Sequence, residues 1–240
     1  MPPSSDPAIT AGKTLGSDAR GFSFALEENQ GRLELRALHR PDYGAIWIDW
    51  GSQELRRRIA GGRKQLMARA LGLAKQPGLH ILDATGGLGR DAFTLAALGA
   101  RVTLVERQPQ IAALLADAHR RALADPGLAE AAARIELRQG QALALLGEGR
   151  WDSIYLDPMY PHGANKTALP QKEMQIFRDL AGADMDADSL LEPALAAARL
   201  RVAVKRPLKA PWLAGRKPGL DFRGTQARFD VYLVSVGGTP

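Results

Sequence analysis

The stretch that decides the fold is Leu79–Arg107, LHILDATGGLGRDAFTLAALGARVTLVER. An apolar run ends at Asp83, a glycine-rich turn follows, a helical pattern opens at Arg90 and Asp91, and a second apolar run ends at Glu106. Glycine lets the backbone pass close to a ligand, and a new helix presents unpaired N–H groups to that ligand. The carboxylate at the tip of the second strand is placed to accept hydrogen bonds from a ribose diol. The stretch therefore predicts a strand, turn, helix and strand that bind a nucleoside.

Two kinds of nucleoside cofactor fit this turn. Gly87, Gly89 and Ala92 satisfy the G-x-G-x-x-G/A fingerprint of dinucleotide-binding proteins, so an NAD-dependent oxidoreductase stays open. Asp83 opposes it, because a carboxylate just before the turn repels a pyrophosphate but suits the ammonium and sulfonium charges of S-adenosylmethionine (SAM). The turn also resembles the first motif of the Rossmann-like methyltransferases, whose key positions fall here on Asp83, Thr85, Gly87 and Gly89. We favour the methyl donor.

Composition restricts the class of protein. The 240 residues suffice for one sizeable core with a small appendage. No apolar run approaches the roughly 20 residues of a membrane helix, and the N-terminus lacks the pattern of an export signal. Cysteine is absent and the four histidines show no metal-ligand spacing. We expect a cytoplasmic protein with no metal and no membrane partner; the sequence predicts nothing about its oligomeric state.

The net charge of +6 is concentrated in two places. One cluster lies in 56–64, and basic residues also dominate the chain from Arg199 onward. Local basic excess is typical of phosphate contacts, although solvated faces that only keep a protein soluble give the same pattern. We predict that RNA contacts Arg56, Arg57, Arg58, Arg63, Lys64, Lys205 and Arg206.

The pattern along the chain predicts three parts. Residues 1–20 carry no periodicity and are expected to form a disordered tail. Residues 21–62 are expected to form a small β-subdomain, with a hairpin at 22–37 and a third strand at 45–50. Residues 63–240 are expected to form an α/β domain with a mostly parallel sheet. We predict a helix at 53–59 in the second part. In the α/β domain we predict helices at 64–73, 108–123, 128–133, 171–180 and 189–198, further strands at 135–137, 153–156 and 200–204, a loop at 219–225, and an antiparallel edge strand at 229–236.

A second motif, Asp157-Pro158-Met159-Tyr160, follows the strand predicted at 153–156. It resembles the [D/N]-P-P-[Y/F] motif of methyltransferases that act on amino nitrogens, with Met159 in place of the second proline. Asp157 would accept a hydrogen bond from the target amine, the Pro158 carbonyl would take the second hydrogen, and Tyr160 would stack on the base. Positioning and fixed dipoles can supply most of the acceleration of such a displacement once the base is unstacked.

Several stretches beyond these motifs resemble the family of ribosomal RNA small subunit methyltransferase J, among them PDYGAIWIDW, RRRIAGGR, DATGGLGRDAF, YLDPMYPH and VAVKRP. The resemblance covers Leu33 to Tyr232 and implies a class I methyltransferase that modifies N2 of a guanine near the 3′ end of 16S rRNA in the small ribosomal subunit. It implies SAM contacts at Arg90, Asp91, Glu106, Arg107, Gln141, Ala142 and Asp157. The loop at 140–142 reads GQA where the family has small hydroxyl residues, and the first twenty residues match nothing.

Other functions share parts of this pattern. An amino-methyltransferase acting on DNA or on a protein glutamine would use the same two motifs. A nicotinamide-dependent oxidoreductase would use the same glycine turn, and a catalytically silent RNA-binding module would use only the basic residues.

Overall fold

The computed structural model describes residues 13–15, 21–159, 172–181 and 187–234. Its strands are β1 (Lys13–Leu15), β2 (Phe24–Asn29), β3 (Arg32–Ala37), β4 (His80–Asp83), β5 (Arg101–Glu106), β6 (Ile135–Gln139), β7 (Trp151–Leu156), β8 (Ala198–Pro207), β9 (Leu220–Arg223) and β10 (Ala227–Leu233). Its α-helices are α1 (Gln53–Ala60), α2 (Leu66–Ala70), α3 (Arg90–Ala97), α4 (Pro109–Ala124), α5 (Ala129–Ala132), α6 (Ala142–Glu148), α7 (Lys172–Ala181) and α8 (Leu191–Ala197). Short 3-10 helices are η1 (Gly62–Lys64), η2 (Ala187–Leu190) and η3 (Leu213–Gly215). Among the described residues, no helix is both long and apolar enough to cross a membrane.

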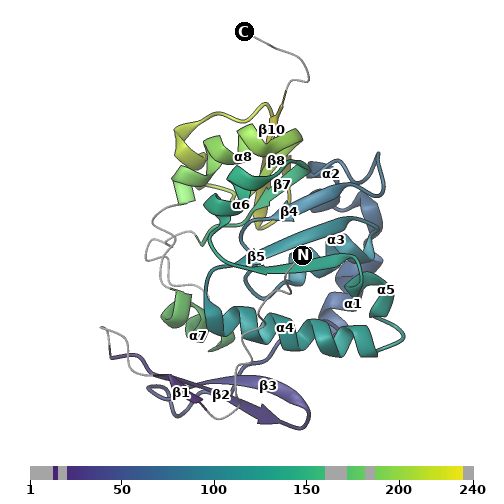
Figure 1. The fold of residues 1–240 in the computed structure, drawn as a ribbon. Helices are drawn as coiled ribbons and strands as arrows, with labels where there is room; N and C mark the ends of the chain where they lie inside the picture. The colour runs from purple at the N-terminus through teal and green to yellow at the C-terminus, as the bar shows by residue number, and fades with distance from the viewer. Residues whose placement is uncertain (1–12, 16–20, 160–171, 182–186, 235–240) are drawn as a thin grey trace.

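The main sheet has the strand order β6-β5-β4-β7-β8-β10-β9. The strands from β6 to β8 are parallel, and β10 pairs antiparallel with both β8 and β9. The strand order reverses at β4, which has β5 on one side and β7 on the other (Figure 1). Open α/β sheets bind ligands at the carboxyl ends of strands at such a point. This arrangement confirms the predicted Rossmann-like α/β fold with an antiparallel addition at its C-terminal end.

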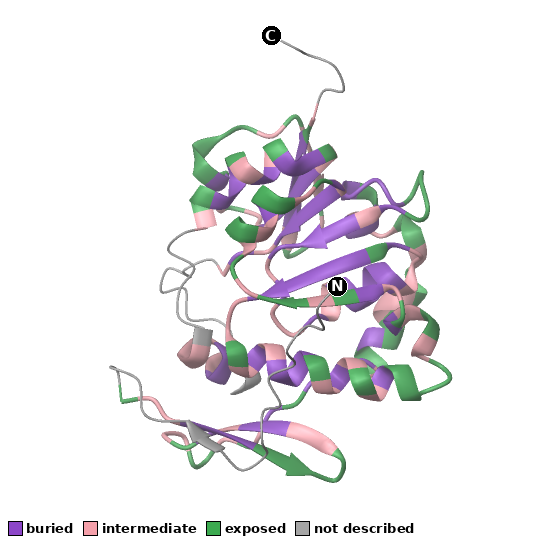
Figure 2. Cartoon of the chain, in the orientation of Figure 1, coloured by how far each residue is buried: buried purple, intermediate pink, exposed green. Residues whose placement is uncertain are grey.

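The central strands of this sheet send alternate side chains into two cores. In β4, Ile81 packs on the face covered by α3 and α4, whereas Leu82 packs on the face covered by α6 and α8. Leu104 and Val105 of β5 divide in the same way. Because successive side chains of a strand point to opposite faces, helices on both faces bury the whole apolar run. Figure 2 shows the central strands buried and the helices exposing their outer sides.

The sheet extends one strand further than the sequence predicts. The antiparallel strand expected near 229–236 is present as β10. β9 lies within 219–225, which the sequence predicts to be a loop, and forms the edge of the sheet beyond β10. Leu220 and Phe222 point to the core side and alternate with the exposed Asp221 and Arg223, but the strand has only four residues, and so short an alternation does not distinguish a strand from a loop.

β2 and β3 form the predicted hairpin. Its two-residue turn at Gln30 and Gly31 has positive φ at both positions, 52° and 76°, as hairpin turns prefer. The hairpin lies on the side of α4 that faces away from the sheet (Figure 1), and the Leu33 N–H donates to the Asp117 carboxylate of α4 at 3.0 Å. β1 pairs with β2, so part of the tail predicted at 1–20 forms a strand.

The strand predicted at 45–50 is replaced by an extended segment. Within these described residues only Ile46 bridges to a strand, at Leu35. The alternation reflects packing on helices: Trp50 is buried and stacks on Phe93 of α3, with 4.9 Å between ring centroids. A period of two therefore indicated an extended, half-buried chain correctly but indicated the wrong partner.

Candidate active site

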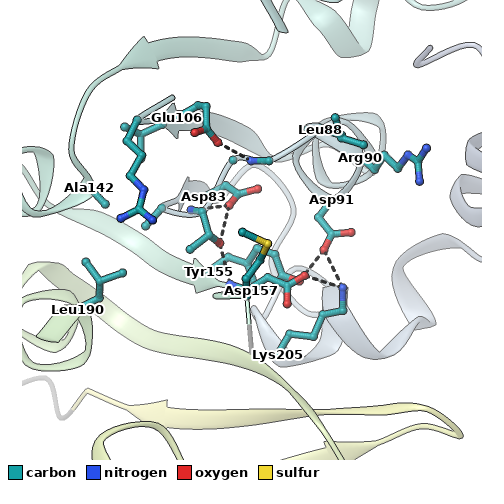
Figure 3. Close-up of a pocket in the computed structure, with 18 of the residues that line it drawn as sticks. Asp83, Leu88, Arg90, Asp91, Glu106, Ala142, Tyr155, Asp157, Leu190 and Lys205 are labelled. Carbon is teal, nitrogen blue, oxygen red and sulfur yellow. Dashed lines mark hydrogen bonds and ion pairs between the residues drawn. The ribbon is translucent and has the colours of Figure 1, made fainter. Parts of the chain in front are cut away.

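A cavity of about 340 Å³ opens at the carboxyl ends of β4, β5 and β7 (Figure 3). Its volume lies in the range of small-molecule sites. Every residue that the sequence predicts to contact a cofactor lines it: Asp83, Thr85, Gly87, Gly89, Arg90, Asp91, Glu106, Arg107, Gln141, Ala142 and Asp157. The predicted positions, which are far apart in the sequence, therefore converge on one site.

The glycine turn lies so close to its neighbours that side chains are excluded. A Cβ at Gly86 would be 2.7 Å from the Val105 carbonyl oxygen, and the Gly86 N–H donates to that same oxygen at 3.0 Å. Gly89 precedes α3 with φ of 68°, and a Cβ there would lie 2.8 Å from Leu115. These contacts fix the turn against β5 and α4, which leaves its other side open to the cavity.

Glu106 is anchored at one end of the cavity. Its Oε2 accepts the Gly87 N–H at 2.9 Å and its Oε1 accepts the Gln108 N–H at 2.7 Å. Burial raises the pKa of Glu106 above its ordinary value, although these backbone N–H groups oppose the shift. Figure 3 shows Glu106 and Ala142 at the same end, away from Asp91. The carboxylate is thus held where a diol could reach its remaining lone pairs.

Thr85 joins the two predicted motifs. The Asp157 N–H donates to the Thr85 hydroxyl oxygen at 2.7 Å, and the Thr85 N–H donates to Asp83 Oδ1 at 3.1 Å. The loops that follow β4 and β7 are therefore linked directly. Pro158 is buried beside this link, and Tyr160 lies outside the described residues.

Three carboxylates, on Asp83, Asp91 and Asp157, gather in the middle and far end of the cavity. Burial, with a contribution from Asp91, raises the pKa of Asp83 from 3.8 to about 8. Burial also raises the pKa of Asp157, whereas Lys205 opposes that rise. Burial alone would raise the pKa of Asp91, but Lys205 and Arg58 hold it below its ordinary value. A cationic group beside Asp83 and Asp157 would lower both pKa values, so this part of the cavity favours a cationic ligand.

Two cations predicted to bind RNA lie in this cavity instead of on the outer surface. The Lys205 ammonium is 2.7 Å from Asp157 Oδ2 and 3.5 Å from Asp91 Oδ2, and Arg58 pairs with Asp91. Burial would lower the pKa of Lys205, but Asp91 and Asp157 raise it, so the ammonium stays charged. Clustered charge in the sequence could not distinguish an outer face from a pocket wall.

Arg206 is incompatible with the predicted RNA contact. It is 5% exposed, and its guanidinium donates from Nε and Nη2 to the Pro211 carbonyl at 3.1 and 2.9 Å. The sequence places Lys205 and Arg206 at the end of a strand, whereas β8 continues to Pro207 and turns the two side chains to opposite faces. The remaining predicted RNA contacts are exposed on α1 and η1: Arg56, Arg57, Arg63 and Lys64.

Sequence patterns did not reveal several residues that line the cavity. The Tyr155 hydroxyl donates to Asp91 Oδ2 at 2.6 Å. The sequence could have indicated this residue, because Tyr155 stands two positions before Asp157 and alternate residues of a strand point to the same side. Phe177 of α7 and Leu190 of η2 also line the cavity. These two come from distant elements and carry no local signal, because apolar residues in amphipathic helices usually pack in the core.

Comparisons with known proteins agree with this geometry. The model of the family described as "Putative SAM-dependent methyltransferase" matches residues 13–234. Ribosomal RNA small subunit methyltransferase J of Aeromonas hydrophila is 48% identical over 217 residues, which cover 88% of this chain and 87% of that protein. The protein of the same name from Stutzerimonas stutzeri is 47% identical over 216 residues, covering 87% and 83%. A crystal structure of a SAM-dependent methyltransferase from Neisseria gonorrhoeae has a TM-score of 0.70 at 35% identity, covering 90% of this chain and 84% of that one. The glycine turn and Asp157 line one cavity, and homology covers most of the chain, so the protein belongs to the ribosomal RNA small subunit methyltransferase J family of SAM-dependent methyltransferases.

Proposed function

We propose that this protein transfers the methyl group of SAM to the exocyclic N2 of one guanine near the 3′ end of 16S rRNA. The observation that carries the proposal is the link through Thr85, which brings the glycine turn and Asp157 together on one cavity. The names of the relatives support small-subunit rRNA as the substrate. The D-P-x-Y loop supports an amino nitrogen as the acceptor.

The residues of the cavity fit SAM. Asp83 would pair with the ammonium group of the methionine part, Glu106 would accept from the ribose hydroxyls, and Gln141 and Ala142 would flank the adenine. When bound, SAM supplies an electrophilic methyl carbon on a sulfonium. The clustered carboxylates fit this role because a cation compensates the repulsion among them.

The acceptor end requires little more than positioning. Asp157 would accept a hydrogen bond from the amine and draw its lone pair out of the ring, and the Pro158 carbonyl would take the other hydrogen. Tyr160 would stack on the extruded base. Because Asp157 lines a cavity at the sheet edge, an amino group can reach it only from an unstacked base.

An RNA path to the cavity follows α1. Its exposed basic residues lie next to Glu54 and Arg58, which line the cavity from the same helix. Phosphates bound along α1 and η1 would thus deliver a base to Asp157. We propose that residues 21–62, including α1, form a subdomain that helps to bind 16S rRNA or the small ribosomal subunit. We propose the cytoplasm as the place where the protein meets this substrate.

The decisive experiment maps methylated nucleotides in rRNA from cells with and without the gene. We expect one N2-methylguanine near the 3′ end of 16S rRNA to disappear on deletion and to return with the wild-type gene but not with Asp157→Ala. An unchanged rRNA pattern, together with label transfer in vitro to DNA or to a protein glutamine, would favour the alternative amino-methyltransferase.

Glu106→Ala tests the cofactor end separately. Loss of a carboxylate that orders the turn and meets the ribose should weaken SAM binding about tenfold or more, since hydrogen bonds to charged groups contribute about 1.5–3 kcal/mol. Isothermal titration calorimetry measures the dissociation constant. Glu148→Ala, at an exposed position of α6, serves as the control and should bind as the wild type does. Equal affinity of both variants would exclude Glu106 from the site.

A further inference from the structure

Lys205 lies between two carboxylates of the cavity. Its ammonium is 2.7 Å from Asp157 Oδ2, and the side chain is 30% exposed. The same ammonium reaches Asp91 Oδ2 at 3.5 Å. Figure 3 shows Lys205 pointing between the two carboxylates. A lysine in this position is unavailable as a free phosphate contact on the outer surface.

The surroundings of Asp157 explain why a cation is needed there. An amine donor binds an anionic carboxylate, yet burial and a neighbouring carboxylate both favour protonation of Asp157. The charged and titratable groups that face it are Asp83 on β4, Asp91 on α3, Tyr155 on β7, Arg58 on α1 and Lys205 on β8. Arg58 pairs with Asp91, whereas Lys205 contacts Asp157 itself. Lys205 is therefore the group best placed to keep Asp157 ionised.

We propose that Lys205 is a positioning residue for methyl transfer, which holds Oδ2 of Asp157 so that the carboxylate stays anionic and its Oδ1 faces the target amine. This role rests on the function proposed above. In that reaction the bond between N2 and the methyl carbon forms as the carbon–sulfur bond breaks, and sulfur keeps the electron pair. N2 then loses one proton along its hydrogen bond to Asp157. A neutral Asp157 would accept the N–H group only through a weaker hydrogen bond to its carbonyl oxygen, and it would be a far poorer acceptor for this proton.

The kinetic test separates this role from an RNA contact. In Lys205→Met, at saturating SAM and RNA, we expect kcat to fall about tenfold or more at neutral pH, with KM for RNA and its salt dependence unchanged. The acidic limb of the pH profile of kcat should move up by about one pH unit, because Asp157 then takes up a proton more readily. Lys205→Arg should restore much of kcat. Lys209→Met removes an exposed lysine from the loop after β8 and should leave kcat and its pH profile as in the wild type.

A second readout needs no cofactor. The ¹³C-carboxyl signal of Asp157 in the free protein, assigned by its loss in Asp157→Asn, reports the protonation of this group directly. Its titration midpoint should rise by about one pH unit in Lys205→Met and stay unchanged in Lys209→Met. In a double-mutant cycle, Lys205→Met should add little to the loss of kcat already caused by Asp157→Asn.

The outcomes are distinguishable. Failure of the wild-type protein to methylate rRNA would refute the proposed function, while the titration of Asp157 would still test its coupling to Lys205. Wild-type kcat together with an unshifted Asp157 signal in Lys205→Met would overturn the positioning role. A raised KM for RNA with unchanged kcat would identify Lys205 as a phosphate contact and overturn it too. Should Lys205→Met fail to fold, Lys205→Gln carries the same expectations.

Discussion

At the scale of single residues, Asp83 lowers the stability of the free protein and is proposed to bind the cationic part of SAM. Its pKa of about 8 means that the folded protein holds a proton which the unfolded chain releases above 3.8. The free energy of unfolding therefore decreases between these pH values as pH rises, because the unfolded state binds fewer protons. SAM would reverse this cost by supplying the missing positive charge.

Asp83→Asn should consequently stabilise the free protein and abolish its binding of SAM. At pH 8.5 we expect a higher melting temperature than that of the wild type and a free energy of unfolding that is larger by at least about 1 kcal/mol. This gain in free energy should shrink toward pH 4. Wild-type affinity for SAM should be higher at pH 7.5 than at pH 6, where Asp83 is more fully protonated. Thermal unfolding at several pH values and calorimetry measure both effects. A variant less stable than the wild type at pH 8.5 would show that the buried, ionised carboxylate of Asp83 does not reduce the stability of the folded protein.

At the scale of elements, the turn between β4 and α3 depends on Gly89. Gly89→Ala would force an alanine to adopt φ of 68° and place its Cβ 2.8 Å from Leu115 and 2.9 Å from Trp50. Left-handed strain and overpacking together should destabilise the protein by about 2–4 kcal/mol, measured by urea unfolding. Gly147→Ala is the matched control, since its Cβ would meet open space within α6, and it should be neutral or slightly stabilising. Equal stability of the two variants would contradict the close packing of this turn.

The same scale shows what the sequence could predict. Strands β4, β5 and β7 were predictable because each is an apolar run whose end is marked by a carboxylate, such as Asp83 or Glu106, on a known edge of the sheet. The segment 45–50 was misassigned because its apolar residues alternate in the same way whether the segment packs on a strand or, as Trp50 does, on α3. The converging motif positions were predictable from topology, whereas the ion pair of Lys205 was not, because it depends on which face of β8 that residue occupies.

At the scale of the whole molecule, the basic charge divides between two tasks. Lys205 and Arg58 face carboxylates inside the cavity, and Arg206 supports the loop after β8. The cations of α1 and η1 that remain exposed have no such partner among the described residues. The net charge of +6 alone therefore overestimates the surface that RNA can use.

This division predicts a salt dependence of RNA binding that is local to α1 and η1. Phosphates bound by these exposed residues release counterions, so removing one phosphate-binding cation should reduce the slope of log K against log salt by about 0.7 for single-stranded RNA. In the test variant, glutamine replaces Arg56, Arg63 and Lys64. The control removes the same charge from exposed positions at the amino ends of the strands, away from the cavity: Lys75, Arg101 and Arg150. Fluorescence anisotropy with a 16S 3′-end fragment from about 50 to 300 mM salt should show a slope reduced by about 2 for the test variant and unchanged for the control. Equal slopes for the two variants would show that net charge, and not the position of these cations, determines RNA binding, and would refute the RNA path along α1 and η1.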